Sequence, residues 1–580
     1  MSNSLFRTKK IESILAEGTD DVHGAGGLKR VLTLRDLTFF GIAAILGAGS
    51  FSSLGGAVFH GGPGVVILFV ITAVACAFTA FCYSEFASRI PVAGSAYTYA
   101  YASFGELFAW IIGWALIMEY SIGNIYVAYS WSDYFTSFLE KINIHIPQYL
   151  CTSYMEVKDA LAVGSTNKDV LNAWETAPMV GGLRIIFDLP AFLINILITL
   201  LVYRGIKESR NFSNVMVILK MIVVVLVILV GGWLVFSHGL TFNWTPPNDE
   251  NIRSFMPNGF SGVMAAVSGV FFAYIGFDAV SVLAEESKNP QRDLPRGMIL
   301  SLVVCTVVYI LLTLVLTGAV NYRNFDGVGD PLAFIFEAQN LNVGWMQFFV
   351  AIAAVVAMTS VMLVFQMGQP RIWMSMSRDG LLPAVFQKIH PKFKTPSFST
   401  VVTGMVVGLP ILFTDKTFVL DFTSIATLFA FVLVCGGVLL IPAREKQPGK
   451  FHLPYINGQF IFPLIVAGAM VLASMLSENY FSNLFDFDFS GNADYTSGKI
   501  SFMDAATPNI SLIIFWLSAI LLAVITFVKK YSLIPLMGLI TCMYLLTGMT
   551  KSNWAWFLGW LAIGLVIYFM YGYKKSKLAV

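Results

Sequence analysis

The stretch Ile45-Leu46-Gly47-Ala48-Gly49-Ser50-Phe51 places two glycines inside the first apolar run of this 580-residue chain. A second stretch, Phe271-Phe272-Ala273-Tyr274-Ile275-Gly276-Phe277-Asp278, interrupts the sixth apolar run in a similar way. Helices broken at corresponding positions of two inverted halves are typical of binding sites at the membrane midplane. Close helix packing is the alternative, because small residues are common at membrane helix interfaces. We favour two helix breaks that form a binding site, because the stretches lie five runs apart.

The composition is that of a membrane protein. Hydrophobic residues make up 57% of the chain and charged residues 12%, whereas soluble domains carry about 25% charged residues. This excludes a soluble enzyme, and a net charge of +2 without a Lys/Arg-rich tract excludes a nucleic-acid partner. The six cysteines form no CxxC and the six histidines lie in tails, loops or run edges. We therefore expect no metal site, no catalytic constellation and no cofactor.

Fourteen apolar runs are long enough, a few of them barely, to cross about 30 Å of hydrocarbon. With the N-terminus in the cytoplasm, most of the 36 Lys and Arg residues fall on the inner side, as the positive-inside rule requires. We therefore expect an all-α polytopic membrane protein with both termini cytoplasmic. The runs lie at 37–59, 64–84, 107–131, 187–203, 214–236, 261–283, 297–320, 345–368, 398–414, 419–441, 459–476, 510–528, 532–548 and 553–573.

The two breaks offer backbone groups to a ligand. Unpaired N–H groups where the outer half of the first run begins would hold a carboxylate, since helix N-termini attract anions. Carbonyls freed at both breaks could accept an ammonium group. The expected ligand is an amino acid, recognised almost entirely by the backbone. The residues expected to form this site are Ala44, Ile45, Gly47, Ala48, Gly49, Phe272, Ala273 and Ile275.

Three charged residues, Glu119, Lys220 and Asp278, lie well inside apolar runs. Each is a functional candidate, because an intramembrane charge costs about 3 kcal/mol on insertion scales. Lys220 either snorkels to the inner surface or lies beside the first run as a proton carrier, since burial disfavours its charged form. Glu119 could attract a cationic substrate side chain, titrate, or pair within the bundle. Asp278 is expected to cap the inner half of the sixth run, and Tyr309 needs a partner if it is buried rather than at the lipid interface.

Further motifs carry a family resemblance that covers most of the chain. Together they resemble an amino acid permease of the amino acid–polyamine–organocation superfamily, closest to its cationic amino acid transporter branch. The motifs are Tyr83-Ser84-Glu85-Phe86-Ala87-Ser88-Arg89-Ile90-Pro91, Gly94-Ser95-Ala96-Tyr97-Thr98-Tyr99, Trp110-Ile111-Ile112-Gly113-Trp114, Phe271 to Val280, Glu285-Glu286, Asn289-Pro290-Gln291-Arg292-Asp293-Leu294-Pro295, Met376-Ser377-Arg378-Asp379-Gly380-Leu381-Leu382-Pro383 and His390-Pro391-Lys392-Phe393-Lys394-Thr395-Pro396.

The resemblance implies the five-plus-five inverted repeat of the bacterial sodium-coupled leucine transporter, with discontinuous helices 1 and 6. It also implies alternating access, and proton rather than sodium coupling. In related bacterial members a span 5 lysine contacts broken span 1 and a span 7 tyrosine, and the matching residues here are Lys220 and Tyr309. Glu119 matches the acidic residue of the span 3 motif.

The resemblance also divides the chain into segments. The last two spans of the family align at the end of the chain, which leaves an inserted two-span hairpin at 459–528. This hairpin is expected to pack peripherally, with docking of an accessory subunit as the alternative. The segments are a cytoplasmic tail (1–36), the first repeat (37–236), the second repeat (237–441), a cytoplasmic loop with the hairpin and its acidic outer loop (442–530), the last two spans (531–573) and a cytoplasmic tail (574–580).

We therefore expect a permease of the bacterial inner membrane that symports a neutral or cationic L-amino acid with protons. Its partners would be the amino acid, protons and membrane lipids. An exchanger on the same fold stays open, and so does a sensor, because fold does not fix function. A channel would favour a continuous polar pore with rings of charge, which these isolated charges do not provide. The sequence does not name the amino acid.

Overall fold

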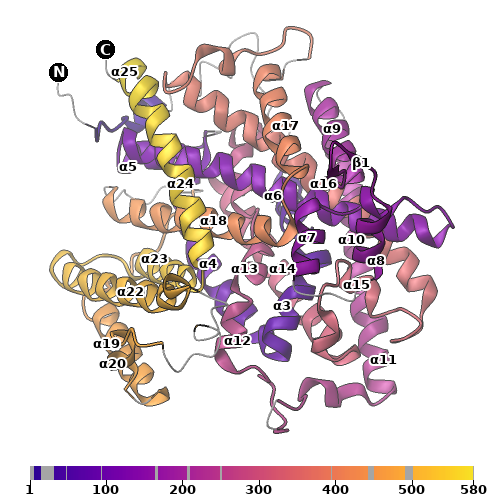
Figure 1. Ribbon diagram of the computed structural model, residues 1–580. Coiled ribbons are helices and arrows are strands. Elements are labelled where there is room, and N and C mark those ends of the chain that lie inside the picture. The colour runs from indigo at the N-terminus through magenta and orange to yellow at the C-terminus, as the bar shows by residue number, and fades with distance from the viewer. Residues whose placement is uncertain are drawn as a thin grey trace.

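The computed structural model describes residues 5–14, 32–47, 49–92, 94–162, 168–204, 209–248, 251–393, 395–441, 448, 450–477, 479–489, 495 and 501–578. Within these ranges the chain is almost entirely helical (Figure 1). Eight of the described helical stretches are long and apolar enough to cross a membrane, and four shorter apolar helices accompany them. The chain is therefore a helical polytopic membrane protein.

The first five apolar runs form helices, and the first of these runs is broken. They comprise α2 (Leu34–Ile45), the π-helical turn η1 (Gly49–Ser53) and α3 (Leu54–Gly61); η2 (Gly62–Gly64) and α4 (Val65–Arg89); α5 (Ser95–Ser103) and α6 (Glu106–Lys141); α9 (Leu189–Arg204); and α10 (Ser209–Leu226), η4 (Val227–Gly231) and α11 (Gly232–Ser237).

A small polar cap follows α6. The sequence predicted a loop from residue 132, but α6 continues to Lys141 because its polar last turns pair with other elements. The cap has its own apolar cluster around Val157 and Ala173. Its elements are η3 (Gln148–Leu150), α7 (Tyr154–Ala162), α8 (Lys168–Thr176) and the two-residue strands β1 (Met179–Val180) and β2 (Leu183–Arg184), which pair antiparallel.

The next five runs also form helices, and the first of these runs is broken. They comprise α12 (Gly259–Ala265), α13 (Val267–Phe272) and the 3-10 helix η6 (Asp278–Glu286); α14 (Pro290–Ala319); α16 (Gly344–Arg378); α17 (Ser397–Ile411); and α18 (Lys416–Leu440). The connections contain η5 (Leu240–Trp244), η7 (Tyr322–Phe325), α15 (Pro331–Phe334) and η8 (Ala384–Gln387).

Of the helices after α18, α19, α20 and α22 lie toward one edge of the molecule, while α23 and α24 pack against α18. α19 and α22 pack with α23 around Phe462, Phe515 and Leu536, in a cluster separate from the main core. Figure 1 shows α19, α20 and α22 at this edge, away from α6 and α14. The elements are α19 (Ile461–Leu476), α20 (Tyr480–Leu484), α22 (Phe502–Lys529), α23 (Leu533–Leu546), α24 (Lys551–Ile567), η9 (Tyr568–Gly572) and α25 (Tyr573–Lys575).

The core surrounds α6. This helix packs along α16 and α18, while α14 packs against α2 and α4. In the most apolar window of α6, 89% of the residues are buried, against 28% in α22. α6 thus lies at the centre of the core, and α22 faces outward.

Both chain ends meet at one end of the molecule, which we call the terminal end (Figure 1). Arg7 pairs with Glu106 at 3.1 Å and Lys9 pairs with Asp379 at 2.7 Å. From the other terminus, the Ser576 hydroxyl donates to the same Glu106. Glu106 is the first residue of α6, whose far end lies about 50 Å away at 1.5 Å per residue. The opposite end of α6 marks what we call the far end.

Candidate functional site

The first break separates α2 from η1. α2 ends at Ile45, the chain bends through Leu46 and Gly47, and helix resumes at Gly49. The backbone N–H groups of Ser50 and Phe51 both donate to the Gly47 carbonyl at 3.1 Å. Two of the N–H groups that were expected to hold a carboxylate are therefore internally paired in this conformation. Ala48, another predicted site residue, lies outside the described residues.

The second break lies directly against the first. α13 ends at Phe272 and η6 begins at Asp278, with Gly276 between them at φ 112°. A side chain at Gly276 would be strained at this φ, and its Cβ would lie 2.8 Å from Cβ of Ala44. A Cβ on Gly49 would lie 2.5 Å from Cα of Ala273. The two breaks therefore approach each other backbone to backbone.

Close packing accounts for both glycines of the first break in this conformation. A Cβ on Gly47 would lie 2.2 Å from Cγ2 of Val361 on α16, and Gly49 abuts Ala273. Protein atoms thus occupy the space that we expected a ligand to approach. Ligand contact at Gly47 and Gly49 stays a prediction, for a conformation in which the neighbouring helices stand farther away.

Lys220 points into the first break. It lies on α10, is fully buried, and its Nζ donates to the carbonyls of Ala43 at 2.8 Å and Leu46 at 2.6 Å. Carbonyls in the last turn of a helix have no partner within the helix. The amine of Lys220 supplies that partner and does not extend to the surface.

Tyr309 bridges the two breaks. It lies on α14, and its hydroxyl oxygen is 2.8 Å from the Ile45 carbonyl oxygen and 2.6 Å from the Ala273 carbonyl oxygen. A phenol has one O–H, so it donates to one of these carbonyls at a time. The other carbonyl can then accept a hydrogen bond from a ligand.

Two buried carboxylates lie beside the second break. Glu119 on α6 and Asp278 are 4% and 1% exposed, and within the described residues Oε2 of Glu119 and Oδ1 of Asp278 have no hydrogen-bond partner. The two carboxylates interact electrostatically. Asp278 is the first residue of η6, one position after the N-cap Phe277, so it faces the helix dipole without being the cap. The unpartnered oxygens can accept a proton or a cation.

Aromatic rings close the breaks toward the terminal end. Tyr83 of α4, Phe277 and Phe431 of α18 pack against one another with ring centroids 5.1 to 6.0 Å apart. η6 leads from Phe277 to Ser287, which pairs with Leu32 just before α2 begins. These rings therefore lie between the breaks and the end that holds both termini.

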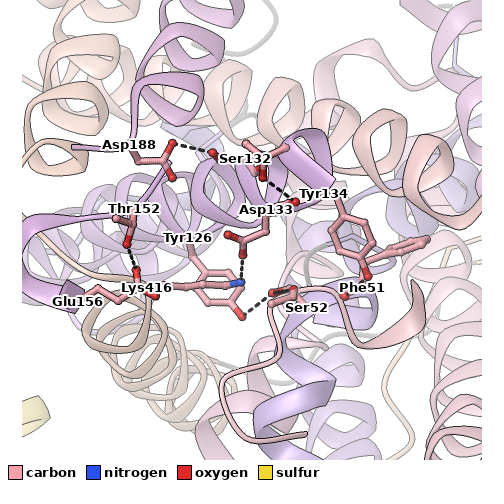
Figure 2. Close-up of polar contacts among 12 residues, drawn as sticks. Phe51, Ser52, Tyr126, Ser132, Asp133, Tyr134, Thr152, Glu156, Asp188 and Lys416 are labelled. Atoms are coloured by element: carbon pink, nitrogen blue, oxygen red, sulfur yellow. Dashed lines mark hydrogen bonds and ion pairs between the residues drawn. The ribbon is translucent and has the colours of Figure 1, made fainter. Parts of the chain in front are cut away.

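Toward the far end, the breaks are covered by a group of four residues that we call the Lys416 cluster: Ser52, Tyr126, Asp133 and Lys416. The Tyr126 ring packs edge-on against Phe272 with centroids 4.6 Å apart, and its hydroxyl lies 3.4 Å from Oγ of Ser52. Lys416 pairs with Asp133, and its Nζ lies 5.7 Å from the centre of the Tyr126 ring (Figure 2). The cluster ties η1 to the start of α18 and the last turns of α6.

The Asp133 carboxylate changes the titration of Lys416 within this cluster. Burial disfavours the Lys416 ammonium, but the Asp133 carboxylate outweighs that effect and holds the pKa of Lys416 above its ordinary value. Nearby, Asp188 accepts hydrogen bonds from the Ser132 hydroxyl and from the Ala191 N–H. The Asp133 carboxylate thus favours the charged form of Lys416 in this pair.

Sequence analysis missed the Lys416 cluster. Asp133 was assigned to a loop after residue 131, and Lys416 to the short connection before the run at 419–441. The available signal was a pair of opposite charges immediately flanking two runs on the same side of the expected topology. Nothing in the sequence indicates that residues so far apart in the chain meet.

Comparison with known proteins places the chain among transporters. A family model described as "Amino acid permease" matches residues 32–487, and a second, described as "C-terminus of AA_permease", matches residues 531–576. The segment between the two matches contains all of α22.

Three relatives show the range of similarity. The branched-chain amino acid permease BcaP of Bacillus subtilis (strain 168) is 42% identical over 448 residues, 77% of this chain and 87% of the relative. The methylthioribose transporter of the same organism is 39% identical over 472 residues, 80% of this chain and 91% of the relative. The vacuolar cationic amino acid transporter 2 of Arabidopsis thaliana is 30% identical over 633 residues, 99% of this chain and 93% of the relative. All three are named as transporters, not enzymes.

Proposed function

The chain belongs to the amino acid permease family of the amino acid–polyamine–organocation superfamily, and on that premise we propose that it is a proton-coupled secondary active transporter of an L-amino acid. It is a transport protein of the membrane, not an enzyme. The observation that carries the proposal is the pair Lys220 and Tyr309, which hold carbonyls of both helix breaks.

We propose fourteen membrane spans, the first ten in two inverted repeats of five. Support comes from helix in each of the fourteen apolar runs and from breaks in the first run of each repeat. The proposed location is a bacterial inner membrane with both termini cytoplasmic, which makes the terminal end the inner one. The excess of Lys and Arg on that side supports this orientation.

The proposed substrate site uses the backbone of both breaks. The substrate carboxylate would bind the N–H groups of the first break, and the ammonium would take the carbonyl, Ile45 or Ala273, that Tyr309 leaves free. Because the Ser50 and Phe51 N–H groups bond Gly47 in the closed form, substrate has to displace those bonds. Binding and opening of the first break are therefore coupled.

Lys220 couples this movement to protons in our proposal. Its ammonium has hydrogens for the Ala43 and Leu46 carbonyls, whereas a neutral amine keeps two hydrogens and loses the charge that strengthens both bonds. Loss of the proton therefore loosens the end of α2. Since α2 and the substrate carbonyls are continuous, the protonation state of Lys220 biases the site between its conformations.

Alternating access requires a closure on each side of the site. The rings of Tyr83, Phe277 and Phe431 are candidates for the inner closure, and the Lys416 cluster for the outer one. With both in place, the conformation described here fits an occluded state.

Among substrates, a neutral or cationic L-amino acid agrees best with the site. The branched-chain amino acid permease favours a neutral one, while Glu119, with its unpartnered oxygen, can accept a cationic side chain. Methylthioribose is a second candidate because a relative of similar identity is named for it. Competition of unlabelled amino acids and methylthioribose against the labelled substrate separates these classes.

The experiment is uptake into proteoliposomes under an imposed proton gradient, with and without sodium. Lys220→Met removes the amine while keeping an unbranched side chain, and we expect gradient-driven uptake to be lost. Lys529→Met, which removes an exposed lysine at the end of α22, is the matched control. A sodium requirement, or full gradient-driven uptake by Lys220→Met, overturns the proton role.

Exchange is tested with the same vesicles. An exchanger needs substrate on the opposite side, so empty proteoliposomes would take up nothing until they are preloaded. Gradient-driven accumulation in empty vesicles supports symport and rejects obligatory exchange. Substrate-independent ohmic currents would instead indicate a channel.

A further inference from the structure

A groove of about 580 Å³ opens between the starts of α2 and α14. Its volume falls within the range of about 300–1,000 Å³ that is usual for small-molecule sites. Arg35 and Phe39 of α2 line one side of the groove. Lys288, just before α14, and Arg292 and Leu300 of α14 line the other. It lies apart from the helix breaks, and the proposed transport mechanism does not use it.

The groove lies at the terminal end. Gln291, in the first turn of α14, accepts a backbone hydrogen bond from Phe451, whose own carbonyl accepts from Ser88 in the last turn of α4. From there α5 leads directly to Glu106, where both chain termini converge. The groove therefore belongs to the same membrane face as the termini.

The lining carries a net positive charge. Its described residues include three cations, Arg35, Lys288 and Arg292, and one carboxylate, Asp293. Asp293 is 2% exposed and its Oδ1 pairs with Nε of Arg292 at 2.7 Å, so part of the Arg292 fork stays available. Arg35 lies over the Phe39 ring at 5.2 Å, and the structure gives neither Arg35 nor Lys288 an ion pair with a described carboxylate.

An apolar strip leads out of the groove along α14. Leu300 at the groove edge is 46% exposed, and it is followed on the same helix face by Val303, Val307 and Leu311 at 56%, 53% and 40%. These positions recur every three to four residues, so they form one stripe. The stripe is about 16 Å long at 1.5 Å per residue, which matches half of a hydrocarbon core of about 30 Å.

We propose that this groove binds the phosphate headgroup of an anionic phospholipid, whose acyl chains lie along the Leu300–Leu311 stripe. The cations bind the phosphate through charge-assisted hydrogen bonds, and the guanidinium groups can do so with two N–H groups at once. A net anionic headgroup is favoured over a zwitterionic one because the described lining residues provide no acidic group free to pair with choline: Asp293 is already paired and buried. The stripe distinguishes a lipid from free phosphate, since only the lipid covers it.

Lipid retention by purified protein tests the proposal without any transport assay. The wild-type protein in detergent receives an equal mixture of phosphatidylglycerol and phosphatidylcholine, and bound lipid is counted by native mass spectrometry. The same is done with the triple variant Arg35→Gln, Lys288→Gln, Arg292→Gln. A control triple variant, Lys529→Gln, Lys530→Gln, Lys574→Gln, removes three exposed cations of the same membrane face outside the groove.

We expect the wild type and the control variant to prefer phosphatidylglycerol about tenfold, and the groove variant to lose most of that preference. Each basic residue near an anionic headgroup is worth up to about fivefold in affinity. Equal retention of the two lipids by the wild type overturns the proposal, and so does an equal loss in both triple variants.

Two further experiments cover a failure of the triple variant to fold and binding of a soluble anion in place of a lipid. If the triple variant does not fold, Lys288→Gln alone, which removes one exposed side chain, has to lower phosphatidylglycerol retention by about threefold. Inorganic phosphate at millimolar concentration has to leave lipid retention unchanged. If phosphate displaces the lipid fully, the groove is a site for soluble anions and the lipid proposal fails.

Discussion

The hydroxyl of Tyr309 lies within hydrogen-bond distance of two carbonyls that come from different broken helices. Tyr309→Phe keeps the ring and removes the hydroxyl donor from both carbonyls, of which the Ile45 carbonyl still accepts the Gly47 N–H at 3.0 Å. We expect the unfolding free energy to fall by about 1 kcal/mol and the initial transport rate by about tenfold, since the breaks lose their shared partner. The measurements are thermal unfolding in detergent and uptake into proteoliposomes.

Tyr322→Phe is the matched control for this change. Tyr322 is also buried, and its hydroxyl donates to Oδ1 of Asn258 away from the breaks. The Tyr322→Phe variant should lose about as much stability as Tyr309→Phe but keep the wild-type transport rate. If the two variants lose transport equally, the role of Tyr309 is structural and not specific to the site.

Alanine substitutions at Gly49 and Gly56 are expected to have opposite effects on stability, although the two glycines are close in sequence. Gly49→Ala places a Cβ 2.5 Å from the Ala273 Cα, so the two breaks must separate, and we expect a loss of about 1–3 kcal/mol. Gly56→Ala in α3 meets nothing within 4 Å and should be neutral or gain up to about 1 kcal/mol. Thermal unfolding midpoints measure both. A harmless Gly49→Ala would mean that the breaks are not in contact.

At the scale of helices, the sequence predicted where α2 and the sixth run break, because glycine spacing marks such sites directly. It also named Lys220 and Tyr309, by charge and by family resemblance. The resemblance implied that Lys220 contacts the broken first span and Tyr309, and the described contacts of Lys220 are with carbonyls of that span. Which carbonyls accept from Lys220 and Tyr309 could not be predicted, since backbone carbonyls carry no side-chain signature. It also placed the end of α6 too early, because a hydropathy pattern stops where polar residues begin although the helix does not.

The extra turns of α6 matter because they carry Asp133 to the start of α18. Lys416→Met leaves Asp133 unpaired and removes the cation beside the Tyr126 ring. Both side chains are partly exposed, at 22% and 31%, so we expect a cost of about 1 kcal/mol and not more. That is about a fivefold shift toward conformations open at the far end.

The shift is measured as the labelling rate of Ser52→Cys by a membrane-impermeant maleimide, with partly exposed Cys151 replaced by serine. Ser52 is 3% exposed, so labelling reports opening. Lys551→Met is the control, because it breaks a pair with Asp504 in which both side chains are about 40% exposed. Faster labelling in the control as well, or in neither variant, would show that the Lys416 cluster does not keep this end closed.

Considered as a whole, the molecule has ion pairs near both ends of α6: Glu106 and Asp379 are paired at the terminal end, and Asp133 is paired with Lys416 toward the far end. At the terminal end, buried Glu106 and Asp379 receive Arg7 and Lys9 from the N-terminus and contacts from Ser576 and Lys577 of the C-terminus. Removal of one partner from a buried ion pair is costly. Arg7→Gln combined with Lys9→Gln should therefore lower stability by about 2 kcal/mol, measured as thermal unfolding. The exposed cations Lys529 and Lys530, replaced in the same way, should leave it unchanged.

The last prediction concerns which side of the membrane each end of α6 faces. Leu578, in the C-terminal tail, is 36% exposed, and Ile144, just beyond α6, is 50% exposed. With Cys151 replaced by serine, Leu578→Cys should react with impermeant maleimide only in inside-out vesicles, and Ile144→Cys only in right-side-out vesicles. Because the 36 residues of α6 separate the two positions, labelling from the same side would mean that α6 does not span the membrane. The reverse pattern would keep the span and overturn the assignment of the basic face to the cytoplasm.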